Sequence, residues 1–259
     1  MKVFIQKFRY SIISILAVMT FLVFWQAGST LSWLNPKFFP SVEVIIATFR
    51  GLLHDGYNGV SLYYHLWSSM KRLLIALFFG FFTAVPLGLL SGMNQTINAI
   101  LNPFIQFYRA LPPLAYYTLL VLYFGIGDSS KIVLLALNAF APLYIATVFS
   151  VQQIPKERLN GVRTLGAKGV DLFLSVIFPS CLPEILNGFR TSIGVAYATM
   201  VAAEMVAAES GIGWMVLDAS KYVRYDVVYV GIIIMGVIAV FIDYIIQKMI
   251  KKLSPWNDL

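Results

Sequence analysis

Few side chains in this sequence are of the types that perform covalent or metal chemistry. The chain contains two histidines, His54 and His65, and one cysteine, Cys181. These are too few to build a Ser/His/Asp or Cys/His catalytic constellation, and their spacing does not match a metal site. The chain also lacks the G-x-x-x-x-G-K-[ST] loop that cradles nucleotide phosphates. We therefore expect no catalytic residue, no metal site and no nucleotide site in this chain.

Ionisable residues inside apolar stretches are better candidates for function, because a charge at membrane depth is costly. Glu204 lies late in such a stretch, either as a gating or pathway contact or as a residue at the outer end that is hydrogen-bonded to a loop backbone. Arg109 could attract anions or extend to the lipid headgroups. Asp243 is expected to pair with a basic neighbour such as Lys248.

Three further residues are candidates for a solute pathway. Tyr116 and Tyr117 follow Pro112 and Pro113, and prolines free backbone groups and bend a helix. The two tyrosine hydroxyls could touch a polar solute, or the two rings could simply pack between helices. Met200 is a candidate as well, although methionines at helical spacing are more typical of a core.

The composition indicates which elements must position these residues. Hydrophobic residues make up 59% of the 259 residues and charged residues only 12%. A soluble domain carries about 25% charged residues, so too few remain here to cover a soluble globule. This argues against an ordinary cytosolic enzyme, a disordered chain and a nucleic-acid-binding domain. The net charge of +7 is typical of a membrane protein whose Lys and Arg lie on the cytoplasmic side.

A membrane-spanning helix needs about 20 mostly apolar residues, and the sequence contains six such stretches. They do not show the alternating pattern of a transmembrane β-barrel. We therefore predict an all-α polytopic membrane protein in contact with lipid, and we interpret the first stretch as a retained helix, not a signal peptide. The six predicted spans are residues 10–26, 73–92, 104–125, 132–151, 185–207 and 228–250.

The basic residues favour a topology with both termini in the cytoplasm. The predicted organisation is an N-terminal transmembrane helix over 1–28, an external loop over 29–72, a five-helix core over 73–250 and a tail over 251–259. In the external loop, Ser41 is a good N-cap, and the residues after it repeat at helical spacing. This pattern predicts an amphipathic helix that lies on the outer membrane face or on the protein's own helical bundle.

The loop over residues 152–184 is the most informative part of the chain. A short helix is predicted over 156–165 and should end at Gly166, because a helix end favours a residue with positive φ. A second helix should then close at Pro179 and Pro183. Its predicted apolar face consists of Val170, Phe173, Leu174 and Ile177. Such a loop is either a docking element or a plain connection between two spans.

This loop resembles the cytoplasmic signature of type I ABC importer permeases, E-A-A-x3-G-x9-I-x-L-P. The central glycine corresponds to Gly166 and the final proline to Pro179, while the first triplet falls on Asn160, Gly161 and Val162. Other segments resemble the nitrate/sulfonate/taurine branch of that family. These segments are LPPLA from Leu111, FGIGDSSKI from Phe124, VAAE from Val201, GIGWMV from Gly211 and LSPW from Leu253.

The resemblance implies the type I ABC importer permease fold and a transport subunit of a bacterial inner membrane, not an enzyme. It implies a second copy of the permease, two ATP-binding subunits that hold ATP and Mg, and an extracytoplasmic solute-binding protein, with no cofactor on this chain. The implied ATPase-coupling residues are Glu157, Arg158, Asn160, Gly161, Val162, Arg163, Leu165, Gly166, Ala167 and Pro179. The pathway candidates are Arg109, Tyr116, Tyr117, Met200 and Glu204.

The substrate is less well defined by the sequence. The ending from Leu253 is similar to taurine permeases, which favours taurine or another sulfonate. Nitrate and a vitamin or pyrimidine precursor are the alternatives within the same family. An ion-coupled secondary transporter is a more distant alternative, because such proteins usually consist of two related halves and no half-repeat is visible here.

Overall fold

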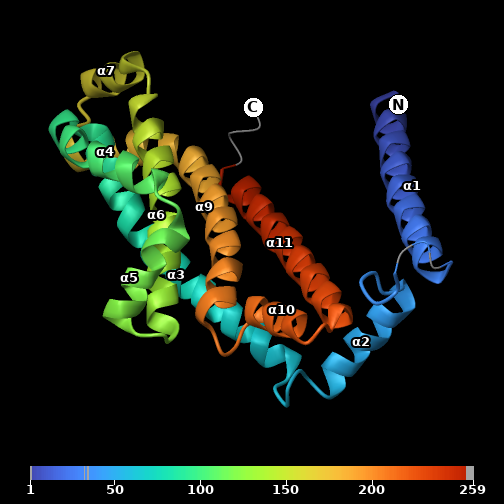
Figure 1. Cartoon of the computed structure of the whole chain (residues 1–259). Helices are drawn as coiled ribbons and strands as arrows, with labels where there is room; N and C mark the ends of the chain where they lie inside the picture. The colour runs from blue at the N-terminus through green and yellow to red at the C-terminus, as the bar shows by residue number, and fades with distance from the viewer. Residues whose placement is uncertain (1, 32, 34, 255–259) are drawn as a thin grey trace. The chain divides into compact units, whose positions relative to one another are not determined.

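The structure, a computed structural model, describes residues 2–31, 33 and 35–254 (Figure 1). Every regular element in this part of the chain is a helix, which confirms the all-α prediction. Pro255 and Trp256, on which part of the resemblance rests, lie outside the described residues. Five helical segments are long and apolar enough to cross a membrane: Ile12–Thr30, Leu62–Met93, Asp128–Gln152, Gly169–Ala207 and Tyr225–Leu253.

The helices form two compact units. The first unit contains α1 (Lys2–Thr30), α2 (Val42–His54), the later turns of α10 (Ile212–Lys221) and the first turns of α11 (Tyr225–Leu253). Helix α2 begins where the sequence predicts, because the Ser41 side chain accepts a hydrogen bond from the Val44 N–H at 3.4 Å. The predicted helix is confirmed, and of its apolar repeat Ile45 and Leu52 are buried whereas Ile46, Phe49 and Leu53 are exposed.

The second unit carries most of the predicted functional residues. It contains most of α3 (Leu62–Met93), α4 (Gln95–Ala110), α5 (Pro113–Phe124), α6 (Asp128–Gln152), α7 (Lys156–Thr164), α8 (Gly169–Leu172), the π-helical turn η1 (Phe173–Ile177), α9 (Phe178–Ala207) and the second half of α11. Its core lies where α3, α6 and α9 meet, around Leu73, Leu135 and Met200. Gly88 allows α3 to approach α6 closely, since a Cβ there would collide with Thr147.

The third predicted span, residues 104–125, is not one continuous helix. Helix α4 ends at Ala110 and α5 begins at Pro113, with Leu111 and Pro112 in extended conformations between them. The reason is the Pro112–Pro113 pair, because prolines donate no backbone hydrogen bond and disfavour helical geometry in the residue before them. The sequence predicted a bend at these prolines, and the structure shows a break.

The prediction that the second loop helix closes at Pro179 and Pro183 is wrong. Helices α8, η1 and α9 run on continuously from Gly169 to Ala207, with Pro179 in the first turn of α9. A π-helical turn comes directly before Pro179, where the Phe178 N–H donates to the Phe173 carbonyl, one residue farther back than in an α-helix, and Pro183 lies inside α9. The predicted apolar face is also only partly correct. Phe173 and Ile177 pack on the core, whereas Val170 and Leu174 are exposed.

Candidate functional site

The first candidate site is the short helix α7 and the turn that follows it. Gly166 has φ +96°, a conformation that favours glycine, and its N–H donates to the Arg163 carbonyl at 3.0 Å. The helix and its glycine end therefore form as predicted. Glu157, Asn160 and Gly161 are exposed.

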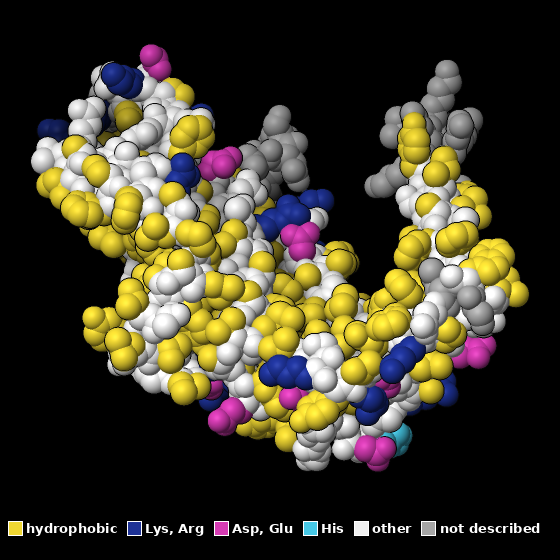
Figure 2. Space-filling model, in the orientation of Figure 1, with side chains coloured by type: hydrophobic (Ala, Val, Ile, Leu, Met, Phe, Trp, Pro, Cys, Tyr) yellow, Lys and Arg dark blue, Asp and Glu magenta, His cyan; other side chains and the backbone are white. Residues whose placement is uncertain are grey.

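The side chains around α7 form an exposed surface with a hollow beside it. Leu165 is 86% exposed. Lys, Arg, Asp and Glu side chains gather around α7, whereas the side chains of α4 and α5 are mainly hydrophobic (Figure 2). The structure brings three of the predicted coupling residues together, and the hollow is lined by Arg158, Val162, Ser175, Val176, Pro179, Ser180 and Pro183. Ala167 is half-buried.

The second candidate site lies at the break between α4 and α5. A hollow of about 280 Å³ is lined by Tyr108, Arg109, Leu111, Asn138, Ala141, Pro142, Ile145 and Val195. The Tyr108 and Tyr116 hydroxyls lie 3.0 Å apart, and the Asn138 amide donates to the Tyr116 hydroxyl at 3.0 Å. Of the predicted pathway residues, Arg109 lines this hollow, and Tyr116 is hydrogen-bonded to two residues that line it, Tyr108 and Asn138.

The other predicted pathway residues lie elsewhere. Tyr117 is buried in a separate cluster with Leu134 and Ala203, and Met200 is buried in the core between α3, α6 and α9. Sequence reasoning missed Tyr108 and Asn138. The available signals were the position of Tyr108 beside Arg109 and the amide of Asn138 in an otherwise apolar span.

Glu204 is fully buried in a network of hydrogen bonds. Its carboxylate accepts from the Ser69 hydroxyl at 2.7 Å, from Arg72 Nη1 at 2.7 Å and from the Gly213 N–H at 3.0 Å. Arg72 also donates from Nε to Asp128 at 2.6 Å. This geometry is close to the second interpretation of Glu204, because the carboxylate accepts from a backbone N–H, although Gly213 lies in the first turn of α10 and not in a loop. The sequence did not reveal Arg72 as its partner.

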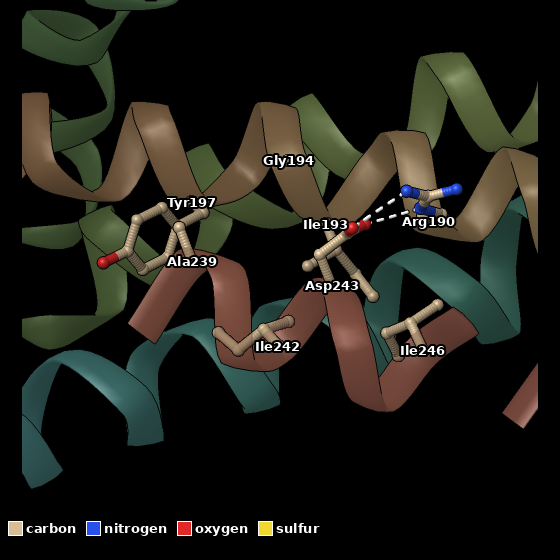
Figure 3. Close-up of a pocket in the computed structure, with 8 residues that line it drawn as sticks. All are labelled: Arg190, Ile193, Gly194, Tyr197, Ala239, Ile242, Asp243 and Ile246. Atoms are coloured by element: carbon tan, nitrogen blue, oxygen red, sulfur yellow. Dashed lines mark hydrogen bonds and ion pairs between the residues drawn. The ribbon is translucent and has the colours of Figure 1, made fainter. Parts of the chain in front are cut away.

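Asp243 pairs with Arg190 and not with Lys248 as expected (Figure 3). Nε and Nη2 of Arg190 donate to the two carboxylate oxygens at 2.5 and 2.8 Å. Lys248 instead lies over the Tyr244 ring, 4.6 Å from its centre. The expectation failed because it considered neighbours in the sequence, whereas the partner lies on another helix. The pair lines a small apolar pocket between α9 and α11 (Figure 3).

Comparison with known proteins defines the class of this protein. Residues 84–255 match the family model described as "Binding-protein-dependent transport system inner membrane component". The chain belongs to this family, and it is an inner-membrane permease subunit of an ABC transporter and not an enzyme. The helices α3, α6, α9 and α11 supply the long apolar segments that such a subunit needs.

The similar proteins belong to the predicted branch. The chain is 35% identical to the taurine transport system permease protein TauC of Escherichia coli K12, over 96% of this chain and 91% of the relative. It is 32% identical to the putative aliphatic sulfonates transport permease protein SsuC of Bacillus subtilis 168, over 90% and 83%. It is 26% identical to the nitrate import permease protein NrtB of Leptolyngbya laminosa, over 83% and 78%.

A solved structure supports the fold. The chain is similar to one chain of the inward-facing MetNI methionine ABC transporter, with a TM-score of 0.61, 18% sequence identity and coverage of 72% of this chain and 93% of that chain. At this identity the similarity shows the fold alone. The type I ABC importer permease fold, predicted from the sequence, is therefore confirmed.

Proposed function

We propose that this subunit imports taurine or another organic sulfonate that an extracytoplasmic binding protein delivers. The observation that carries this proposal is the 35% identity to a taurine permease over nearly the whole chain. The similarity to SsuC supports sulfonates as a class. Nitrate is the second candidate because of the similarity to NrtB, whose sequence identity is lower.

The proposed mechanism places the energy source on partner subunits. Two ATP-binding subunits, which hold ATP and Mg, dock against α7 and Gly166 on a pathway formed by two copies of this chain. Exposed Leu165 and the hollow beside α7 support this docking surface, since a partner can bury apolar area there. A rigid helix held by a tight turn then transmits the movement of the ATP-binding subunits to a bundle with two stable states.

The substrate is tested by uptake into proteoliposomes that contain the permease, its ATP-binding subunits and loaded binding protein. Labelled taurine, an alkanesulfonate, nitrate and a pyrimidine vitamin precursor are compared at equal concentration. The proposal predicts ATP-dependent uptake of taurine or the alkanesulfonate. Uptake of nitrate or of the vitamin precursor without either sulfonate would refute the proposed substrate.

The docking surface is tested with Gly166→Pro and Gly166→Asp. Both changes conflict with the positive φ of Gly166, so the turn after α7 cannot form as it is. We expect normal insertion of the subunit and loss of ATP-dependent uptake. Gly51→Ala is a matched control, because Gly51 lies in α2 and a Cβ there meets no atom within 4 Å. Normal uptake by both Gly166 variants would contradict the coupling role.

A further inference from the structure

The break between α4 and α5 lies beside the middle of α6. The hollow at the break is lined by Asn138, Ala141, Pro142 and Ile145, which belong to the central turns of α6 (Asp128–Gln152). Because α6 is long enough to cross the membrane, the break lies near mid-membrane. Irregular backbone at that depth is tolerated where it lines a cavity, and transporters often place a solute site at such broken helices.

Arg109 is the charged residue of this hollow. Its side chain is exposed, and among the described residues it forms no hydrogen bond or ion pair. Arg72, Arg190 and Arg224 differ from it, since each forms an ion pair with a carboxylate. An unpaired guanidinium at membrane depth is costly in lipid, so this side chain must face water or an anion.

The neighbouring polar groups can donate to an anion as well. The Tyr116 hydroxyl accepts from Asn138, and either tyrosine can be the donor between Tyr108 and Tyr116. An anion site in this hollow needs Tyr116 to donate, which leaves the Tyr108 proton for the anion. Asn138 uses its amide group to donate to Tyr116 and to the Leu134 carbonyl, which holds the pair in place. Tyr108 and Arg109 line the hollow together.

We propose that this hollow is an oxyanion site of the permease itself, in which Arg109 and Tyr108 bind the sulfonate group of the passing solute. The guanidinium fork matches two oxygens of an oxyanion, and the phenol can donate to a third. The hollow of about 280 Å³ is slightly smaller than typical ligand pockets of about 300–1,000 Å³, which suits a solute of a few heavy atoms. This inference rests on the proposed sulfonate substrate and gives the permease a part in selectivity.

The first test compares Arg109→Gln, Arg109→Lys and Tyr108→Phe in proteoliposomes with saturating taurine-loaded binding protein. We expect Arg109→Gln to lower the uptake rate about tenfold or more, the loss expected for a charge-assisted hydrogen bond. Arg109→Lys should retain more uptake than Arg109→Gln. Tyr108→Phe should also lose less uptake than Arg109→Gln. The ATPase rate without solute should not change, which separates solute binding from a structural role. Arg50→Gln, an exposed arginine of α2, is the matched control.

The outcomes separate this inference from the proposed function. If the unaltered complex takes up neither sulfonate, the proposed substrate is wrong. If the unaltered complex takes up taurine, and the Arg109→Gln variant takes it up as fast as the Arg50→Gln control, the oxyanion site is wrong. A parallel loss of uptake and of solute-free ATPase activity in Arg109→Gln would also overturn the site, because it would indicate damage to the structure.

A second test asks whether the hollow is open to water. Arg109→Cys and Leu122→Cys are treated with a negatively charged, sulfonate-bearing thiol reagent in the assembled complex. Leu122 on α5 is 77% exposed and apolar, so we expect it to face lipid, and the native Cys181 is fully buried. The site predicts labelling of Arg109→Cys and no labelling of Leu122→Cys. No labelling at position 109 would overturn it.

Discussion

Replacement of Glu204 by glutamine tests whether its role is structural. The Glu204 carboxylate is fully buried, and Arg72 is only 4% exposed. Glu204→Gln removes the negative charge and leaves Arg72 with Asp128, which is 49% exposed. Removal of one partner of a buried ion pair costs about 3–5 kcal/mol. At about 2–4 °C for each kcal/mol, Tm should fall by about 6–20 °C.

The assay is thermal unfolding of the purified complex in nanodiscs, together with uptake at a temperature where both proteins are folded. We expect a lower Tm and nearly normal uptake per folded complex. A gating or pathway contact at Glu204, the first interpretation from the sequence, predicts the reverse result, with Tm unchanged and uptake lost. That result would refute the structural role.

A double-mutant cycle isolates the pair itself. Glu204→Met and Arg72→Met should each be strongly destabilising. The first leaves buried Arg72 with only the half-exposed Asp128, and the second leaves the buried Glu204 carboxylate without its guanidinium. The double variant should be more stable than either single variant, since apolar side chains of similar volume can replace a buried pair. If the two effects simply add, the ion pair between Arg72 and Glu204 does not carry the stability that its geometry implies.

Three further predictions concern single contacts. Asp243→Asn leaves Arg190 without its carboxylate and should lower the yield of folded complex. The double variant Arg190→Asp with Asp243→Arg should restore the yield. Equal yields of the unaltered complex, Asp243→Asn and the double variant would contradict this. Gly211→Ala should lower Tm by several degrees, because Gly211 has φ +124° and a Cβ there would collide with the buried carboxylate of Glu204. An unchanged Tm would be evidence against this packing. Burial and the hydrogen bond to Asp218 raise the pKa of Tyr57 from 10.0 to about 12, so its contribution to stability is complete below pH 10 and falls as the pH rises through 12. The absorbance of ionised tyrosine, measured as the difference from Tyr57→Phe, should show a midpoint near 12, and a midpoint near 10 would disprove the contact.

Local signals allowed much of the helical structure to be predicted. Ser41 marks the start of α2 because its side chain caps the backbone three residues later, and Gly166 marks the end of α7 because it tolerates positive φ. The apolar stretches indicated the long helices because a bilayer requires them. These features depend on residues close together in the sequence, so the sequence contains the information that fixes them.

Features that depend on packing between helices could not be predicted. Arg72 and Glu204 are 132 residues apart, and Arg190 and Asp243 are 53 apart, so no spacing rule connects them. The same limit applies to the prolines. Pro112 breaks a helix, whereas Pro179 lies within a continuous helical stretch, because the preceding π-helical turn and the packing of Phe173 on the core hold that segment together.

The hollow at the break between α4 and α5 contains residues that the sequence could identify and residues that only the packing of helices brings together. Arg109 and Tyr116 could be selected from the sequence as a charge and a hydroxyl in an apolar stretch. Tyr108 and Asn138 complete the polar group only when α6 lies against the break. Residue type therefore identified half of the group, and the fold supplied the other half.

The most direct measurement of the central claim is sulfonate uptake into proteoliposomes that contain the complete complex, with either ATP or an ion gradient as the energy source. An importer permease coupled through Gly166 predicts uptake that requires ATP, is unaffected by proton or sodium gradients and is lost in Gly166→Pro. Uptake that continues without ATP while a proton or sodium gradient is present would contradict the account.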